Sequence, residues 1–390
     1  MPPTIPVVVV GGSLNGLGVV RSLALGRMPI YVIEKSRSCV AAWSRHCNFI
    51  RVSGLGGRGL IDTLMALGYR LESRPVLILT GDDSVDMVSA HRSEIARLFR
   101  ISLPSEEMVR SLSEKTLFQA LAEREGFAVP RAVTLAGKAD LELLRALAPP
   151  LILKPANKTL VLNGVVERAA RADSLAEAQT AAARMLKCAP RIIVQEWIDG
   201  PDTEIFFTLF SCDRHGKPLG LFAGRKLVCC PPAVGNTAIC VAAPEVADEL
   251  NAKTLQFIER VRYRGLGSLE FKRDSRTGRF VIIEPTVGRT DWQEEISTLC
   301  GVNLPLLTYW AELDQPAEAE GVSSRPIAWR ASIGHRVPRG ALYPGTRMID
   351  GMLRWSDPLP ALYWYCYQQT ALRLWNRVGR LFSSHHRSSP

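Results

Sequence analysis

Two glutamates in one predicted β-hairpin are the residues whose type and spacing point most directly to chemistry. Glu270 lies in the run SLEF and Glu284 ends the run FVIIE, with a DSRTG turn between the two strands. A turn centred near Arg276 or Thr277 sets the two glutamates roughly opposite each other across the ladder. Like charges in that position destabilise a sheet unless a cation neutralises them. Oxygen ligands with no His or Cys beside them in the sequence favour Mg²⁺, which also binds substrate phosphates.

A purely structural interpretation of the hairpin is equally open at this point. In it, both glutamates are exposed on an edge hairpin and pair with Lys272 and Arg279. Cations at apolar positions elsewhere favour the first interpretation, because a lysine that faces an interior needs an anion or a functional reason. Each of them taken singly is also explained by a side chain that snorkels to the surface. These cations are Lys154 in the run LILKP, Arg225 and Lys226 in another apolar strand, and Lys115 on a helix.

The elements that must position these residues indicate an α/β domain followed by an α+β region. Residues 1–104 read as a doubly wound α/β domain, because the apolar run 5–10, a glycine-rich turn, a helix and a second strand form a βαβ unit. Strand, helix and hairpin patterns alternate over 105–312, which is typical of an α+β domain. Within that region, LILKP at 151–155 is predicted to be a short strand and GVVERA at 164–169 to be another. Residues 313–390 form a C-terminal extension.

Composition places few limits on function. The chain has 390 residues, enough for two or three domains, and a formal net charge of +10. That charge favours anionic partners such as nucleotides, acidic substrates or anionic lipid, and no motif predicts binding to nucleic acid. Nine cysteines without a CxxC pair indicate a reducing compartment. With no signal-peptide pattern and no apolar run of about 18 residues, we expect a cytoplasmic protein.

The order of these motifs resembles the ATP-grasp superfamily of carboxylate–amine ligases, over about residues 1–312. In that family a small α/β domain precedes two α+β subdomains that hold ATP between them, and the lid subdomain would be about 115–195 here. The resemblance rests on SEKTLFQALAEREGFAVP, LILKP, IIVQEWIDGPDTE, GRKLV, SLEF and VIIEPT. Every segment is short, but the ordered set is specific.

The resemblance implies an ATP and Mg²⁺ site with a role for each matching residue. The cations that would hold the phosphates are Lys115, Lys154, Arg225 and Lys226. The backbone that would bind the adenine edge is that of Glu196, Trp197 and Ile198. The ribose would bind Asp202, or else Glu204. The Mg²⁺ ligands would be Glu270, Glu284 and Thr286. Arg289 would face the reacting carboxylate or acyl phosphate, where a planar guanidinium suits both anions, and would share catalysis with Lys226.

Two departures from the family pattern bear on activity. Thr286 stands where the family usually has Asn, and a hydroxyl binds Mg²⁺ or its water more weakly than an amide carbonyl does. The phosphate loop after Lys154 is usually rich in Gly and Ser, whereas it reads ANKTLVLNG here. Asn157, Lys158 and Thr159 offer substitute contacts in that loop.

The function predicted in this way is an ATP- and Mg²⁺-dependent ligase that joins a carboxylate to an amine, or else to a thiol, through an acyl phosphate. An alternative is an NAD(P)-dependent oxidoreductase, because GGSLNGLG follows a strand and Glu34 ends the next one, as in an imperfect dinucleotide fingerprint. A catalytically silent ATP-binding protein is a further alternative. Small-molecule carboxylate and amine substrates are the expected partners, and a homodimer is compatible with the sequence.

The C-terminal tail carries its own pattern. At helical spacing, ALRLWNRVGRLF over 371–382 gathers its apolar residues on one face and three arginines on the other. A basic amphipathic helix of this kind either lies on an anionic membrane or docks on the protein's own core or on a second subunit.

Overall fold

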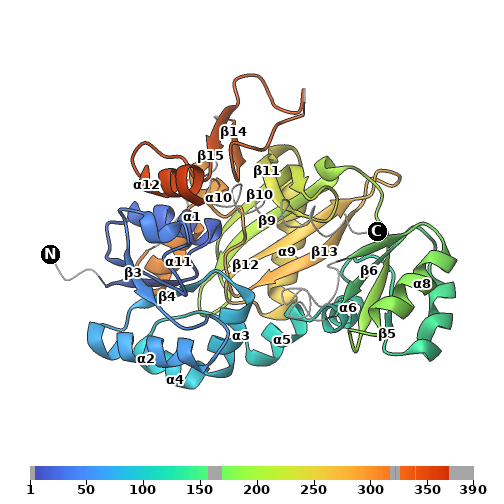
Figure 1. Ribbon diagram of the computed structural model, residues 1–390, viewed down its shortest axis with the longest axis horizontal. Coiled ribbons are helices and arrows are strands. Elements are labelled where there is room, and N and C mark those ends of the chain that lie inside the picture. The colour runs from blue at the N-terminus through green and yellow to red at the C-terminus, as the bar shows by residue number, and fades with distance from the viewer. Residues whose placement is uncertain (1–4, 157–168, 317–320, 322–325, 339, 369–390) are drawn as a thin grey trace, which may run out of the picture.

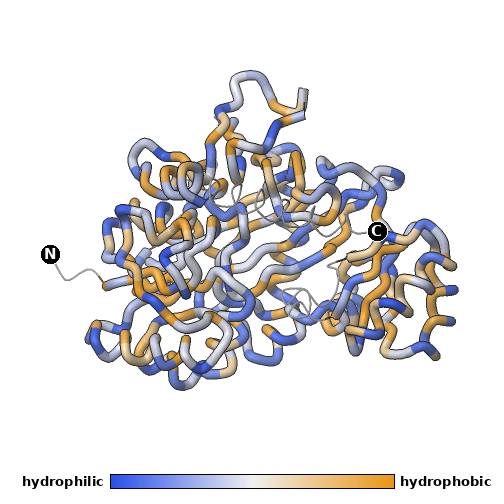
Figure 2. Tube along the Cα trace, in the orientation of Figure 1, coloured by the Kyte–Doolittle hydropathy of each residue, from blue (hydrophilic) through white to orange (hydrophobic). Residues whose placement is uncertain are grey.

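The computed structural model describes residues 5–156, 169–316, 321, 326–338 and 340–368. Within these residues the strands form three sheets that follow one another across the molecule (Figure 1). Figure 2 shows that the most apolar parts of the chain run along the strands and the inner faces of the helices.

The first sheet is a parallel one in the order β3-β2-β1-β4. Its strands are β1 (Val7–Val10), β2 (Ile30–Glu34), β3 (Asn48–Arg51) and β4 (Val76–Leu79). The helices of this region are α1 (Leu14–Ala24), η1 (Ala41–Trp43), α2 (Arg58–Leu71), α3 (Asp82–Ala90) and α4 (Arg92–Leu98). Every residue of β1 and β4 is buried, as expected for strands covered on both faces. The predicted βαβ unit is confirmed.

Close packing explains the glycines of the first turn. Gly11 has φ +105°, and a Cβ there would lie 2.1 Å from Thr80 Oγ1. A Cβ on Gly16 would lie 2.1 Å from the carbonyl oxygen of Gly11. The glycines therefore let α1 start directly against β4 and its own loop.

The central sheet has the order β13-β12-β9-β10-β11-β14-β15. Its strands are β9 (Ile205–Cys212), β10 (Pro218–Cys230), β11 (Asn236–Ala242), β12 (Gly265–Arg273), β13 (Phe280–Val287), β14 (Ile327–Arg330) and β15 (Arg347–Asp350). The accompanying helices are η3 (Asp202–Glu204), η4 (Pro244–Val246), α9 (Ala247–Val261), α10 (Glu295–Leu299) and α11 (Leu304–Glu312). The β12–β13 hairpin and the helix near 245–262 are both confirmed.

The third sheet is antiparallel, in the order β5-β8-β6-β7. It lies within the segment of about 115–195 that was predicted as the lid subdomain, and this sheet with η2 and α8 is called the lid below. Its strands are β5 (Ala132–Leu135), β6 (Leu151–Pro155), β7 (Ala170–Ala172) and β8 (Ile192–Glu196). The nearby helices are α5 (Glu106–Ser113), α6 (Lys115–Arg124), η2 (Lys138–Ala146) and α8 (Leu175–Met185). The phosphate loop after Ala156 and nearly all of the predicted strand 164–169 lie outside the described residues.

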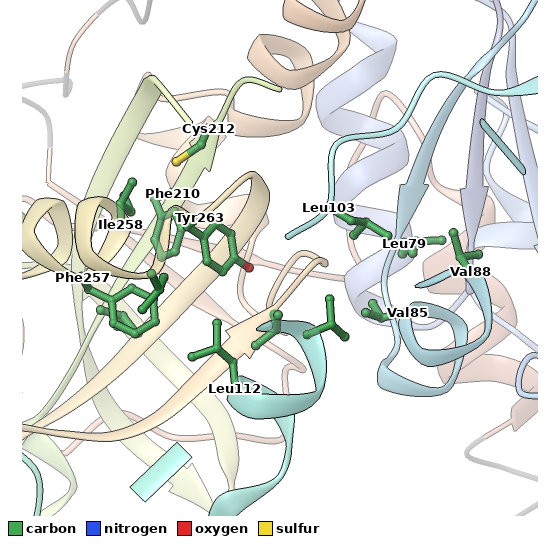
Figure 3. Close-up of a cluster of buried hydrophobic side chains, with 14 of the residues drawn as sticks. Leu79, Val85, Val88, Leu103, Leu112, Phe210, Cys212, Phe257, Ile258 and Tyr263 are labelled. Atoms are coloured by element: carbon green, nitrogen blue, oxygen red, sulfur yellow. The ribbon is translucent and has the colours of Figure 1, made fainter. Parts of the chain in front are cut away.

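Two kinds of core distinguish the lid from the rest of the molecule. One buried cluster runs from Leu79 and Val85 of the first region to Phe210 of the central sheet and Tyr263, which lies between α9 and β12 (Figure 3). The lid has a smaller cluster of its own, in which Leu151 of β6 packs against α8. The first and central regions therefore share a continuous core, whereas the lid is stabilised mainly by its own contacts.

The C-terminal region is more closely integrated than the word extension suggests. β14 pairs with β11, and Trp329 on β14 is 1% exposed. The Arg21 guanidinium of α1 donates to the Asp357 carboxylate at 3.1 Å and to the Gly351 carbonyl at 2.7 Å. The chain then continues through α12 (Leu359–Leu362) and η5 (Tyr363–Gln368). Among the described helices, none is long and apolar enough to cross a membrane, and the predicted amphipathic helix lies outside them.

Candidate ATP and carboxylate site

A cavity of about 390 Å³ lies where the lid, the central sheet and the first region meet. Ten of the twelve predicted site residues line it. From the lid side these are Lys115, Lys154, Glu196, Trp197 and Ile198. From the central sheet and the loop after it they are Lys226, Glu270, Glu284, Thr286 and Arg289. Asp202 and Arg225 are not among its lining residues.

The two glutamates pair residue for residue. Glu270 of β12 is the register partner of Glu284 of β13, and Ser268 is the partner of Thr286. Because side chains alternate along a strand, both pairs share the face that lines the cavity. The register shifts directly beyond Glu270, so Ile283 is an extra residue on β13 and its side chain also lines the cavity. The predicted opposition of the two carboxylates is confirmed.

A buried lysine from a third strand completes this end of the cavity. Lys226 of β10 is 4% exposed, and its ammonium group donates a short hydrogen bond to Glu270 Oε2. Burial alone would lower the pKa of Lys226, but the Glu270 carboxylate and other nearby acids more than offset this, so the net pKa is raised. Lys226 is therefore a fixed positive charge beside the paired carboxylates.

Arg225 lies on the opposite face of β10 from Lys226, as strand alternation requires. Its guanidinium stacks 5.9 Å from the Phe206 ring centre and is 3.6 Å from Glu245. The structure thus separates the two adjacent cations that the sequence had grouped as phosphate ligands.

The donor set at the hairpin suits Mg²⁺. Two carboxylates and the Thr286 hydroxyl are all hard oxygen donors. In the part of the chain that the structure describes, no group of three or more His, Cys, Asp or Glu comes together as a metal cage. Magnesium keeps several waters and takes phosphate oxygens as further ligands, so a two-carboxylate site is enough for it. These residues fit the predicted ion.

The lid and the helix before it contribute cations from β6 and α6. Lys154 and Ile152 share the face of β6 that lines the cavity, whereas Leu151 and Leu153 face the lid core. Lys154 Nζ lies 3.4 Å from Gln195 Oε1. Lys115 begins α6 and also lines the cavity. Both lysines are half-buried, in keeping with cations that meet a ligand rather than solvent.

The segment predicted for the adenine edge follows β8 along the cavity wall. The Trp197 amide donates to the Pro150 carbonyl at 2.9 Å, and Glu196 Oε1 accepts from the Ala148 amide at 3.0 Å. The Trp197 amide is therefore engaged within the lid. The Glu196 amide likewise donates to the Arg131 carbonyl at 2.9 Å, so within the predicted segment a main-chain donor to a base edge would have to be the amide of Ile198.

Lys272 corrects an expectation. The plainer interpretation of the hairpin made it an exposed partner of the glutamates, but it is 5% exposed and lines the cavity. Its ammonium donates to the carbonyls of Gly200 and Pro201 at 2.7 and 2.8 Å. Burial lowers the pKa of Lys272, an effect that nearby acids partly offset. Strand alternation explains the correction, because Lys272 follows Glu270 by two residues and shares its face.

Asp202 supports the cavity from outside. Its two carboxylate oxygens accept from the amides of Cys229 and Ala233 at 2.8 and 2.9 Å. The Cys229 amide belongs to the end of β10 and the Ala233 amide to the β10–β11 connection, and Ala233 lines the cavity. The alternative ribose ligand, Glu204, is paired with Arg273 at 2.5 Å. Both acids are thus engaged by protein groups, and Asp202 acts here by holding a loop.

The chain leaves β13 at Gly288, and this turn carries Arg289 to the first region. Gly288 has φ +65°, and its amide donates to the Tyr263 hydroxyl at 2.8 Å. Arg289 Nε then donates to Asp82 Oδ1, at the start of α3, at 2.5 Å. Burial would lower the pKa of Arg289, but Asp82, Asp291 and Glu284 more than offset this, so it is raised and the guanidinium stays charged.

Several lining residues were missed by the sequence reasoning. Asp82 comes from the first region, and Asp291, Trp292 and Gln293 follow Arg289 directly. The polar run TDWQEE after the hairpin was a signal that could have found three of them. Thr290 between them is held by the buried Asn15, whose side-chain amide donates to the Thr290 carbonyl at 3.0 Å.

The glycine-rich turn has a structural explanation in place of the dinucleotide one. Glu34 Oε2 accepts from the Gly12 amide at 2.9 Å, and Oε1 accepts from the Lys35 amide at 2.7 Å. A dinucleotide site needs that acid to bind a ribose hydroxyl. Here the main chain of the turn itself engages it, and the turn does not line the large cavity.

Comparison with known proteins places the fold. No family model matches the chain. A D-aspartate ligase of Enterococcus faecium is 22% identical over 320 residues, which cover 76% of this chain and 74% of the relative. An ADP complex of an N5-carboxyaminoimidazole ribonucleotide synthetase has a TM-score of 0.67 at 13% identity, covering 84% of this chain and 81% of its own. The biotin carboxylase domain of the Hydrogenobacter thermophilus 2-oxoglutarate carboxylase, a dimer in complex with MgADP, ADP and bicarbonate, has a TM-score of 0.62 at 11% identity, with 83% and 72% covered.

These likenesses show that the chain has the ATP-grasp fold, with the parallel sheet, the central sheet and the lid in the expected order. The fold class predicted from the sequence is therefore confirmed. The roles of single residues stay predictions.

Proposed function

We propose that this protein is an ATP- and Mg²⁺-dependent ligase that joins a carboxylate to an amine. The observation that carries the proposal is the pairing of Glu270 with Glu284 beside the buried Lys226, in a cavity that Lys115 and Lys154 also line. Paired acids with converging lysines suit a polyphosphate and its cation. The similar proteins support the same class, since they include a D-aspartate ligase and complexes with ADP and MgADP.

The reaction runs in two steps. A carboxylate oxygen attacks the γ-phosphorus of ATP, an oxygen–phosphorus bond forms, and the bond to the β-phosphate oxygen breaks to release ADP. The amine then attacks the acyl carbon, and inorganic phosphate leaves. Mg²⁺, when held by Glu270, Glu284 and Thr286, supplies neutralisation of phosphate charge.

The chain's own groups contribute mainly fixed positive charge. Lys115, Lys154 and Lys226 neutralise the polyphosphate, and Arg289 binds the carboxylate and then the oxyanion of the tetrahedral intermediate. The continuous core between the first and central regions keeps Arg289 in place against the paired acids.

Lys272 acts in this scheme as a positioning residue. It ties the strand that carries Glu270 to the Gly200 and Pro201 carbonyls, which directly follow the predicted adenine segment. Lys272 therefore fixes the position of the predicted adenine segment relative to the strand that carries Glu270.

A screen for ADP and phosphate release tests the proposal. Purified protein with MgATP is offered pairs of amino acids, polyamines and sugar acids, with D-aspartate among the acids. A productive pair should release one phosphate per condensed product, and mass spectrometry should find acid plus amine minus water. ATP binding without phosphate release from any pair would favour the catalytically silent alternative, which Thr286 keeps open.

Peripheral contact with an anionic membrane is a second proposal, which rests on the C-terminal surface. Large apolar side chains are exposed just before the basic segment 371–382, among them Trp355 at 89%, Leu362 at 53% and Tyr367 at 67%. Deleting residues 369–390 should abolish cosedimentation with phosphatidylserine vesicles. A cut before Pro358 would be a poor test, because the partly buried Tyr365 packs against the core and its hydroxyl donates to Asp350.

The assembly and the compartment complete the proposal. A homodimer is supported by the dimer of the biotin carboxylase domain. A reducing, cytoplasmic environment is supported by nine free cysteines, among which the neighbours Cys229 and Cys230 face opposite sides, one buried and one exposed.

A further inference from the structure

One carboxylate lines the cavity without a role in the scheme above. Asp291 follows the hairpin by a short turn, and its side chain is fixed by three donors. Its Oδ2 accepts from Ser268 Oγ at 2.9 Å and from Gln293 Nε2 at 3.1 Å, and its Oδ1 accepts from the Trp292 amide at 2.7 Å.

The position of Asp291 relative to the metal end follows from its bond to Ser268. Ser268, Glu270 and Lys272 share one face of β12, and alternate residues are spaced by about 7 Å. Lys272 marks the base end, through its bonds to Gly200 and Pro201. Asp291 therefore lies on the other side of Glu270, at the end of the cavity opposite the proposed base site.

Buried neighbours hold this carboxylate in one orientation. Gln293, which donates to it, is 1% exposed and accepts from Thr237 Oγ1 at 3.0 Å. Ser268 is also 1% exposed. Thr290, the residue before Asp291, is fixed to the first region by Asn15. A carboxylate fixed by so many groups is prearranged for a ligand.

The charges around Asp291 favour a cationic ligand. Arg289, two residues earlier, already has Asp82 as its partner at 2.5 Å. Asp291 adds a second acid to this end of the cavity. The charge of Lys226, which also acts on Asp291, is balanced by its hydrogen-bonded partner Glu270, so these five charges sum to −1. A substrate carboxylate is attracted by Arg289 and repelled by Asp291, whereas a protonated amine is attracted by Asp291.

We propose that Asp291 binds the amine substrate and takes the proton that its nitrogen loses during attack on the acyl phosphate. This inference rests on the ligase activity proposed above and selects an amine over a thiol or water as the nucleophile. The bound ammonium first loses one proton through Asp291 to water, which frees the nitrogen lone pair. The lone pair then forms the C–N bond, the C–O bond to phosphate breaks, and the phosphate leaves with the electron pair. The second proton that the nitrogen loses also moves to an Asp291 oxygen and from there to water.

Partition between two nucleophiles tests this role. Wild type and Asp291→Asn are given MgATP, the carboxylate that succeeds in the release screen, with D-aspartate tried first, and either hydroxylamine or putrescine. Hydroxylamine is largely uncharged at neutral pH and traps an acyl phosphate as a hydroxamate without help from a base. For Asp291→Asn we expect amide formation with putrescine to fall about 100-fold and hydroxamate formation to stay within about threefold.

Two further variants separate this role from a structural one. Ser268→Ala keeps the charge of Asp291 but loosens it, and should raise the KM for the amine about fivefold with a smaller change in kcat. Asp314→Asn removes an exposed acid paired with Arg214 at 2.6 Å, and should leave both products as in wild type. Binding of a fluorescent ATP analogue checks that each variant retains its nucleotide site.

The outcomes are distinct. A joint fall of amide and hydroxamate in Asp291→Asn, or a fall of neither, overturns the role of Asp291 and leaves the ligase proposal standing. A wild type that forms neither ADP nor hydroxamate with any acid overturns the ligase, and the role of Asp291 with it.

Discussion

Two strands of this protein carry nearly the same letters up to a glutamate and put their glutamates to different uses. β2 ends as YVIE at Glu34, and β13 contains VIIE ending at Glu284. Glu34 accepts from the amides of Gly12 and Lys35 and closes a turn. Glu284 faces a second carboxylate, Glu270, across the ladder and lines the cavity. A glutamate that follows an apolar run of a strand is therefore no evidence of a site until its cross-strand partner is known.

The neighbouring cation explains why the second arrangement is tolerated. Two opposed carboxylates destabilise a sheet, and the buried Lys226 offsets this at Glu270. In β2 the register partner of Glu34 is Arg51 of β3, and the acid meets main-chain donors. The first acid thus stabilises a turn, and the second is held ready for a cation and its phosphates.

The largest expected effect comes from exchanging these two acids for their amides. Glu284→Gln should lower ATP turnover about 10³-fold, because it removes a metal ligand next to the transferred phosphate. Glu34→Gln should keep turnover within severalfold and instead lower the free energy of unfolding by about 1–3 kcal/mol, since a charged acceptor of main-chain hydrogen bonds is lost. Steady-state kinetics and urea unfolding of both variants measure this. Equal turnover in the two would remove the distinction between the strands.

A smaller effect is expected at the cation. Lys226→Met should lower turnover about 100-fold, because it removes a fixed charge beside the phosphates and leaves the half-buried Glu270 without its cation. Arg225→Met, on the opposite face of the same strand, is the matched control and should change turnover less than threefold. Similar losses of turnover in both variants would show that the effect does not depend on which face of β10 the cation occupies.

Nucleotide affinity gives a third, more modest test. Lys154→Ala should weaken binding of an ATP analogue about tenfold, because its ammonium lines the cavity from the lid. Lys272 is unsuitable as the control, since it is buried and holds the Gly200 and Pro201 carbonyls. Arg171→Ala offers a lid cation whose guanidinium stacks 4.9 Å from the Trp197 ring centre, and it should change affinity less than threefold. Isothermal titration calorimetry compares the two variants. A larger loss of affinity for Arg171→Ala than for Lys154→Ala would show that the predicted position of the phosphates is wrong.

The smallest expected effect is on the pH dependence of stability, and it concerns a third acid, Glu294, which stays protonated in the folded protein. Burial, with Asp291 nearby, raises the pKa of Glu294 to about 8, from 4.5. As pH rises between these values the unfolded chain loses this proton while the folded chain keeps it, so stability falls, by roughly 1 kcal/mol per pH unit. Glu294→Gln should flatten that decline. Urea unfolding of the wild type and Glu294→Gln at about pH 5 and about pH 8 measures this change in stability. An equal decline in both proteins would show that a group other than Glu294 causes it.

The sequence was most informative where chemistry and strand period coincide. The opposition of Glu270 and Glu284, the inward Lys154 and the parallel first sheet follow from alternation and apolar runs. The same rule misled when adjacent residues were grouped, since Arg225 and Lys226 must point to opposite faces of one strand. Strand alternation was not applied to Lys272, which shares a face with Glu270 and was therefore wrongly expected to be exposed.

The residues that sequence reasoning missed are those brought in by tertiary contact. Asp82 meets Arg289 across 207 positions of chain, and Asn15 reaches Thr290 across 275. No local pattern encodes such distances. The role of Asp202 was equally hidden, because a carboxylate that holds two loop amides reads the same in sequence as one that binds a sugar.

Binding of a manganese–nucleotide complex tests the central claim most directly, since it needs no knowledge of the acid or amine. Mn²⁺ replaces Mg²⁺, a non-hydrolysable ATP analogue replaces ATP, and electron paramagnetic resonance counts the bound ion. The wild type and Glu34→Gln should bind the ion in a nucleotide-dependent manner, and Glu284→Gln should lose at least about tenfold in affinity. Undiminished binding by Glu284→Gln would contradict the assignment of the β12–β13 hairpin as the metal and phosphate site.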